Sequence, residues 1–136
     1  MMRQQIEEYA AAGQKAMMQG NYAVAQQNFE KLIKLDPGIA EVHAMLAVID
    51  FKQHEFSKAI HEIEIAKRLK PGLPRLGSLL GIALSEEGRY AEAIPHLKKG
   101  FRDSKDKAVK KMCGLELMRS YSNLNRDPDA VQVAWR

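Results

Sequence analysis

The sequence predicts an all-α protein in which helical hairpins stack on one another at a constant interval. Three observations lead to this fold class: similar residues recur every 34 positions, apolar residues follow helical spacing, and no segment alternates as a β-strand does. The recurring positions form five columns, which are Ala25, Ala59 and Ala93; Tyr22, Phe56 and Tyr90; Phe29, Ile63 and Leu97; Gly13, Ala47 and Gly81; and Pro37 with Pro71. Five columns in phase indicate a repeat array and not a helical bundle that acquired its spacing by chance.

The central unit, residues 40–73, predicts one complete hairpin. Helices are expected over residues 41–53 and 56–69, with a turn at His54-Glu55 and an end at Pro71-Gly72. Small and large inward residues at helical spacing allow the two antiparallel helices to pack closely. These inward residues are Leu46, Ala47, Asp50, Phe56, Ala59, Ile63 and Ala66.

The flanking units repeat this plan over residues 6–39 and 74–107. In the first unit, helices are expected from about Gln4 and over residues 23–35, with a turn at Gly20-Asn21 and an end at Pro37. The third unit begins on Pro74, which is acceptable in a first helical turn. Gly100 weakens its second helix by about 1 kcal/mol relative to alanine, unless the next helix must approach closely at that point.

Beyond the third unit the phase slips by three residues. A helix is expected to start near Asp106, and a partial fourth unit covers residues 111–136, with Asp127-Pro128 starting its second helix. The expectation is therefore about eight helices in a single domain, residues 1–136. The last residues are apolar, and three explanations are open: they cap the third unit, they pair with another copy, or the chain is the first part of a longer one. The first and third are favoured over self-association through this C-terminal helix. The apolar residues are Val131, Val133, Ala134 and Trp135.

At these columns the chain resembles the tetratricopeptide repeat family, whose unit is a 34-residue helix-turn-helix. It departs from the family pattern at His54, where glycine is usual, and at Lys105, where proline is usual. The resemblance implies a right-handed α-α superhelix whose first helices line a concave groove. The matching residues are Gly13, Gly20, Tyr22, Ala25, Phe29, Leu32 and Pro37 in the first repeat, and Gly81, Gly88, Tyr90, Ala93, Leu97 and Gly100 in the third.

Composition favours a soluble, cytoplasmic protein. Apolar residues make up 46% and charged residues 28%, and there is no apolar run long enough to enter a membrane. The net charge is +4, and seven basic residues lie between Lys98 and Lys111. With only Phe101 interleaved, this run predicts a solvated surface, and nucleic-acid binding is not expected. The one cysteine, Cys113, predicts a buried thiol.

No catalytic site, metal site or cofactor is predicted. The four histidines lie in separate helices or turns, and His54-Glu55 lacks the second histidine of a helical zinc site. His43 is expected to be a packed core imidazole. The carboxylates do not pair in helical phase, and no glycine-rich loop follows a strand.

The resemblance implies that the concave groove binds a peptide or helix of a partner protein. It places Met17, Met18, Met112 and Leu115 among the groove positions, and it gives an apolar floor flanked by polar residues. The groove residues expected to carry binding are Gln14, Met17, Val48, Phe51, Lys52, Arg75, Ile82 and Arg119. In the other view, the protein's own terminal helix fills this groove.

Some relatives of this family bind acidic chaperone tails through a carboxylate clamp. The corresponding residues here are Ala10, Gln14, Met45, Arg75 and Leu79, of which only Arg75 keeps the required charge. No binding of an EEVD tail is therefore expected. The function predicted from the sequence is a non-catalytic interaction scaffold. The alternative is a regulatory or targeting module of a longer chain, which could itself be enzymatic.

Overall fold

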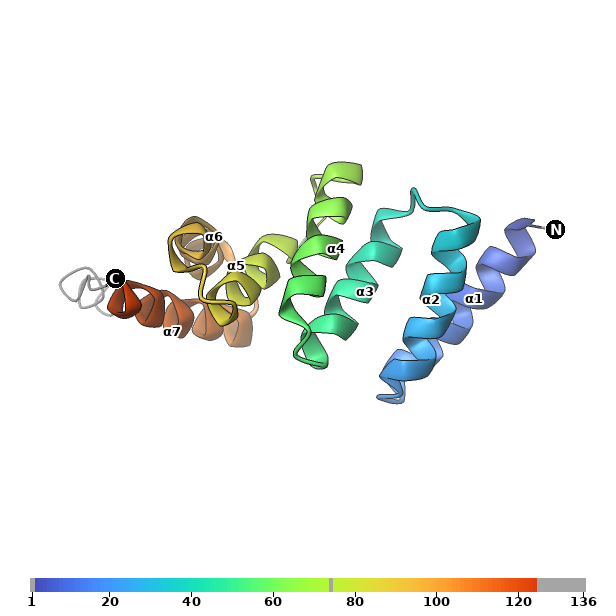
Figure 1. Ribbon diagram of the computed structural model, residues 1–136, viewed down its shortest axis with the longest axis horizontal. Helices are drawn as coiled ribbons and strands as arrows, with labels where there is room; N and C mark the ends of the chain where they lie inside the picture. Colours follow the sequence, from blue (N-terminus) through green and yellow to red (C-terminus); the bar gives the residue numbers. More distant parts are fainter. Residues whose placement is uncertain (1, 74, 125–136) are drawn as a thin grey trace. The chain divides into compact units, whose positions relative to one another are not determined.

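The computed structural model describes residues 2–73 and 75–124, and these residues form seven α-helices and no strand (Figure 1). The expected eighth helix, with Pro128 and Trp135, lies outside the described residues, as does Pro74. The helices are α1 (Met2–Met18), α2 (Tyr22–Leu35), α3 (Ala40–Lys52), α4 (Phe56–Leu69), α5 (Leu76–Glu86), α6 (Tyr90–Asp103) and α7 (Lys107–Asn123). The all-α prediction is confirmed, and α4 has the predicted bounds.

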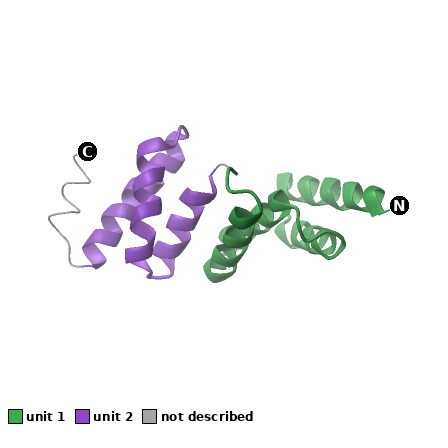
Figure 2. Ribbon diagram, turned by 90° about the horizontal axis from the view of Figure 1, so that it is seen from above, with its two compact units in different colours: residues 1–73 green, residues 74–136 purple. Residues whose placement is uncertain are grey.

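The helices belong to two compact units, Met1–Leu73 and Pro74–Arg136 (Figure 2). Unit 1 contains the hairpins α1–α2 and α3–α4, and α2 also packs against α3. Unit 2 contains the hairpin α5–α6, and α7 packs against both of its helices. The expectation of one continuous domain stays a prediction.

All three hairpins turn in the same way. Gly20, His54 and Gly88, which are 34 residues apart, have positive φ angles of 73°, 61° and 80°. This left-handed residue lets the chain close the first helix with a pair of backbone hydrogen bonds, as in the Schellman motif. In each turn one bond spans five residues and measures 2.8 Å: Asn21 donates to Ala16, Glu55 to Asp50, and Arg89 to Leu84. The departure at His54 therefore changes the residue but not the turn.

The repeated columns occupy equivalent places in the core. Ala25, Ala59 and Ala93 are each fully buried. A small residue is also needed where the first helix meets the second, because a Cβ atom at Gly13 would lie 2.6 Å from the ring of Phe29. The 34-residue interval therefore reflects a packing contact that recurs in each hairpin.

In unit 2, glycines bring α6 and α7 close together. A Cβ atom at Gly100 would lie 2.6 Å from both Sγ of Cys113 and Oγ of Ser78. A Cβ atom at Gly114 would lie 2.9 Å from the ring of Phe101. The packing reason expected for Gly100 is thus confirmed. The helix expected near Asp106 is α7, which Asp106 caps by accepting hydrogen bonds from the first turn.

Candidate functional site

Unit 1 carries five of the eight predicted groove residues, on α1 and α3. Gln14 and Lys52 are exposed. Met17 is half-buried against the core, and Val48 is half-buried. The Phe51 ring is half-buried and meets the Phe56 ring edge-on, with centroids 5.4 Å apart. These side chains therefore offer partial apolar surface.

Unit 2 carries the other three, and they differ more from expectation. Ile82 was expected on the groove floor, but it is only 4% exposed. The Arg119 guanidinium donates to Glu86 at 3.0 Å and to Glu116 at 3.2 Å. Arg75 is exposed, and its guanidinium lies 3.9 Å from the Asp106 carboxylate. A groove that joins these residues to those of unit 1 stays a prediction.

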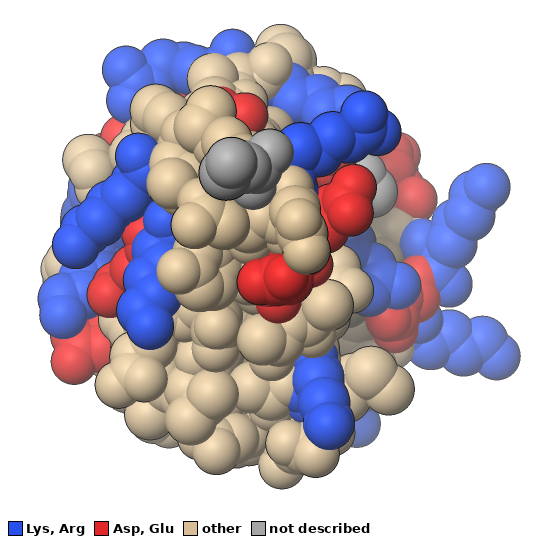
Figure 3. Space-filling model, turned by 90° about the vertical axis from the view of Figure 1, so that its right-hand side faces the viewer, with Lys and Arg blue, Asp and Glu red and all other residues tan. Residues whose placement is uncertain are grey.

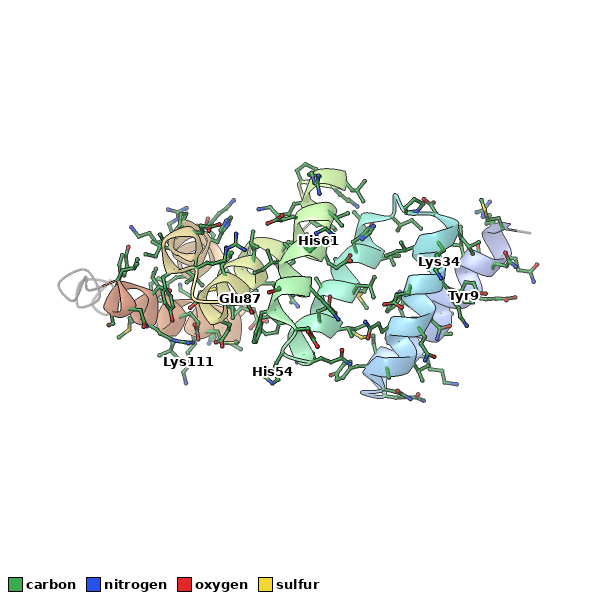
Figure 4. The ribbon with its side chains drawn as sticks, viewed as in Figure 1. Tyr9, Lys34, His54, His61, Glu87 and Lys111 are labelled. Atoms are coloured by element: carbon green, nitrogen blue, oxygen red, sulfur yellow. The ribbon has the colours of Figure 1, made fainter. Side chains whose placement is uncertain are left out.

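Unit 1 also contains a cleft of about 600 Å³, between α2 and α4 with α3 beneath it. Figure 4 labels Lys34 on α2 and His61 on α4, two residues of its opposite walls. None of the predicted groove residues lines it. The lining residues are Gln26, Glu30, Ile33 and Lys34 on α2; His43, Leu46 and Asp50 on α3; and Ser57, Lys58, His61 and Glu62 on α4.

At one end of this cleft, the His43 side chain of α3 contacts both α4 and the loop between α2 and α3. Its Nδ1 lies 2.7 Å from the Glu62 carboxylate, and its Nε2 lies 2.9 Å from the backbone carbonyl of Pro37. Both ring nitrogens of His43 therefore have a polar partner, which is what a buried imidazole requires. The His43 side chain is 7% exposed and lies against the Glu62 carboxylate. The prediction of a packed imidazole is confirmed.

Asp50 lies two helical turns further along the floor and is 4% exposed. The pKa of Asp50 is raised to about 6, first because burial removes hydration from the charged form and second because the Glu62 carboxylate lies nearby. Lys58 acts in the opposite direction without cancelling these effects. A carboxylate in this setting gains from any added positive charge nearby.

Two side chains distinguish the α2–α3 junction of unit 1 from the α6–α7 junction of unit 2. Leu32 occupies the repeat position of Gly100, two intervals earlier. His43 likewise occupies the position of Gly114, once the three-residue slip is allowed. Where unit 2 has two glycines that let α6 meet α7, unit 1 has a leucine and a histidine, both buried. The α2–α3 junction therefore has two larger side chains where the α6–α7 junction has glycine.

The sequence reasoning missed this cleft, although a signal for it was present. Asp50 was treated only as an inward packing position of its helix. His43 and Asp50 are seven residues apart, so they share one face of α3, a helix that is otherwise largely apolar. Two polar residues on a buried helix face are candidates for a polar site.

The described residues contain no group of three or more potential metal ligands. Nor does any helix in the described ranges have the length and apolar character needed to cross a membrane. The Cys113 thiol is buried as predicted, and burial raises its pKa.

Known proteins resemble this chain in both sequence and fold. The tetratricopeptide repeat signature matches residues 16–82. The small glutamine-rich tetratricopeptide repeat-containing protein 2 of Mycosarcoma maydis is 30% identical over 106 residues, which cover 77% of this chain and 30% of that protein. The chain therefore spans less than a third of that relative.

Two solved structures show the same fold. The crystal structure of MamA superposes with a TM-score of 0.77 at 21% identity, covering 94% of this chain and 73% of MamA. The TPR2B domain of yeast Sti1, solved as a complex with pHsp70, gives a TM-score of 0.71 at 18% identity, covering 88% of this chain and 98% of that domain. Proteins with such repeats generally mediate protein–protein interactions. Together with the 34-residue columns and the three equivalent turns, these matches identify the chain as a member of the tetratricopeptide repeat family.

Proposed function

We propose that this protein is a non-catalytic interaction module that binds a peptide or helix of a partner protein along the first helices of its hairpins. The observation that carries the proposal is the exposure of large apolar side chains on α1 and α7. Met18 is 88% exposed, Met112 is 43% exposed and Leu115 is 56% exposed. All three occupy positions that the family resemblance assigns to the groove, and apolar surface in such places commonly serves binding.

The surface around α1 supports this proposal. In the view toward the α1 side, uncharged side chains cover much of the middle, with a few Asp or Glu side chains among them and Lys and Arg side chains mainly toward the edges (Figure 3). Burial of Met17, Val48 and Phe51 against a ligand would supply affinity, since each is still partly exposed. Lys52 would orient an acidic group of the ligand.

The polar residues of unit 2 constrain the ligand. Arg119 already pairs with Glu86 and Glu116, so an acidic ligand must compete with two carboxylates for it. Arg75 is the one charged residue left at the positions of the chaperone-tail clamp. The Sti1 domain was solved with pHsp70. For this chain we nevertheless propose a ligand other than an EEVD tail.

A quantitative pull-down with Met18→Glu tests the proposal. Met18 is almost fully exposed, so the substitution should leave the fold intact. Phe51→Glu is the second variant, with thermal unfolding as a check because Phe51 packs on Phe56. Leu69→Glu is the matched control, since Leu69 is an exposed apolar residue of α4 outside the predicted groove.

The expected result is a companion protein recovered with the wild type and the Leu69 variant but lost with both groove variants. Equal recovery with all four proteins would remove the groove from consideration.

A further inference from the structure

The cleft between α2 and α4 has the chemistry of a receptor for one particular kind of side chain. Its volume of about 600 Å³ is in the range of ligand sites in proteins. Ile33 and Leu46 give it apolar surface, and Glu30 and Asp50 add carboxylates. We propose that this cleft binds an arginine or lysine side chain of a partner polypeptide. Such a side chain combines an aliphatic stem with a cationic end, which matches this lining.

The carboxylate on the floor is fixed, whereas the competing cations are not. Asp50 is nearly buried on α3, between the two walls. Lys34 and Lys58 are exposed residues of the walls, so their flexible ammonium groups can remain in water when a ligand enters. A guest cation that reaches Asp50 would therefore gain a partially desolvated charge interaction that the two lysines do not saturate.

The other titratable groups of the cleft favour the same guest. The Glu62 carboxylate lies 2.7 Å from Nδ1 of His43, so it is already engaged in a contact within the cleft. Glu30 and Glu55 are further carboxylates within electrostatic reach of Asp50, and both raise its pKa, as Glu62 does. His61 lies on the α4 wall and is exposed. A cation is thus preferred over an anion at the floor.

This cleft is distinct from the groove of the proposed function. On α3, the cleft residues His43, Leu46 and Asp50 follow helical spacing on one side. At about 100° per residue, Val48 projects from nearly the opposite side of the same helix, and Phe51 lies about a quarter turn away from His43 and Asp50. The two sites can therefore be tested separately, and either can fail alone.

The test is a titration of the isotope-labelled full chain, followed by amide chemical shifts in NMR spectra. The probe is acetyl-Ala-Arg-Ala-amide, and its citrulline analogue, which has the same shape without the charge, is the control ligand. Asp50→Asn and Glu30→Gln are the test variants. Glu64→Gln is the matched control protein, because Glu64 is an exposed carboxylate of α4 that does not line the cleft.

We expect the arginine peptide to shift amides of the cleft residues, and the citrulline peptide to bind at least roughly tenfold more weakly. Each test variant should weaken arginine binding several-fold, while Glu64→Gln and Phe51→Glu leave it unchanged. Glu30 is exposed, so its variant reports on binding even if Asp50→Asn disturbs the fold. Equal shifts with both peptides, unchanged binding in both test variants, or no shifts in the cleft would each overturn the proposal.

Discussion

Gly100→Ala is a direct test of how closely the helices of unit 2 approach. The new methyl group would lie 2.6 Å from Sγ of Cys113 on α7 and 2.6 Å from Oγ of Ser78 on α5. Real Cβ contacts are essentially never shorter than 3.0 Å, so the Cys113 and Ser78 side chains, or the helices that carry them, must shift. Overpacking of this kind costs about 1–3 kcal/mol, and the better helix propensity of alanine offsets about 1 kcal/mol. The expected net loss is up to about 2 kcal/mol.

Gly77→Ala is the matched control in the same unit. No heavy atom lies within 4 Å of the position that its Cβ would take, and its φ angle is not positive. The substitution should therefore raise stability, by up to about 1 kcal/mol. The same substitution is thus expected to lower the unfolding free energy at Gly100 and to raise it at Gly77.

Urea unfolding followed by circular dichroism gives the first measurement. The second uses Cys113, the one cysteine of the chain, because its thiol is buried and reacts only when unit 2 opens. A loss of about 2 kcal/mol should raise the labelling rate by roughly 30-fold in Gly100→Ala. If both alanine variants are more stable than the wild type, α5 and α7 do not approach α6 at Gly100 as closely as the structure shows.

Three further predictions concern single residues of unit 1. The folded-state pKa of Asp50 is raised from 3.8 to about 6, so its contribution to stability is full below about pH 3.8 and is lost as the pH rises through 6. Asp50→Asn should therefore stabilise the protein by up to about 3 kcal/mol at pH 8 and much less at pH 4, and equal effects in urea unfolding at the two pH values would contradict this. His54→Gly should raise the unfolding free energy by about 0.5–1 kcal/mol, because glycine adopts the φ of 61° without strain; a lower urea midpoint would refute that reason. His43→Ala should lower the unfolding free energy by about 2 kcal/mol or more, because Glu62 and the Pro37 carbonyl lose their partner. Unchanged thermal stability would show that the His43 ring does not make these two contacts.

The fold could be predicted from the sequence because its determinants are local and repeated. The position of Ala25 within its hairpin recurs at Ala59 and Ala93, so one packing solution serves all three. The turn is equally local, since it needs one left-handed residue and backbone hydrogen bonds. Such features follow directly from a 34-residue interval.

The candidate sites were less predictable, because they depend on residues far apart in the sequence. The columns show which helix faces pack, but not how closely neighbouring hairpins approach. The close approach of α6 to α7, for example, needs Gly100 and Gly114, at positions where unit 1 has Leu32 and His43. Likewise, the sequence predicted that Arg119 would orient a ligand, whereas its ion pair with Glu86 joins residues 33 positions apart.

The three equivalent turns fix the number of residues between the two helices of each hairpin. An extra residue inside one of them would rotate the following helix by about 100° and carry its apolar stripe toward water. Insertions are therefore expected only in the loops that connect one hairpin to the next. The chain follows this rule: Leu46 and Leu80 are 34 residues apart, whereas Leu80 and Leu117 are 37 apart, and the three additional residues fall after α6 is complete. In this chain the change in repeat length therefore lies in a loop between hairpins and not in a turn.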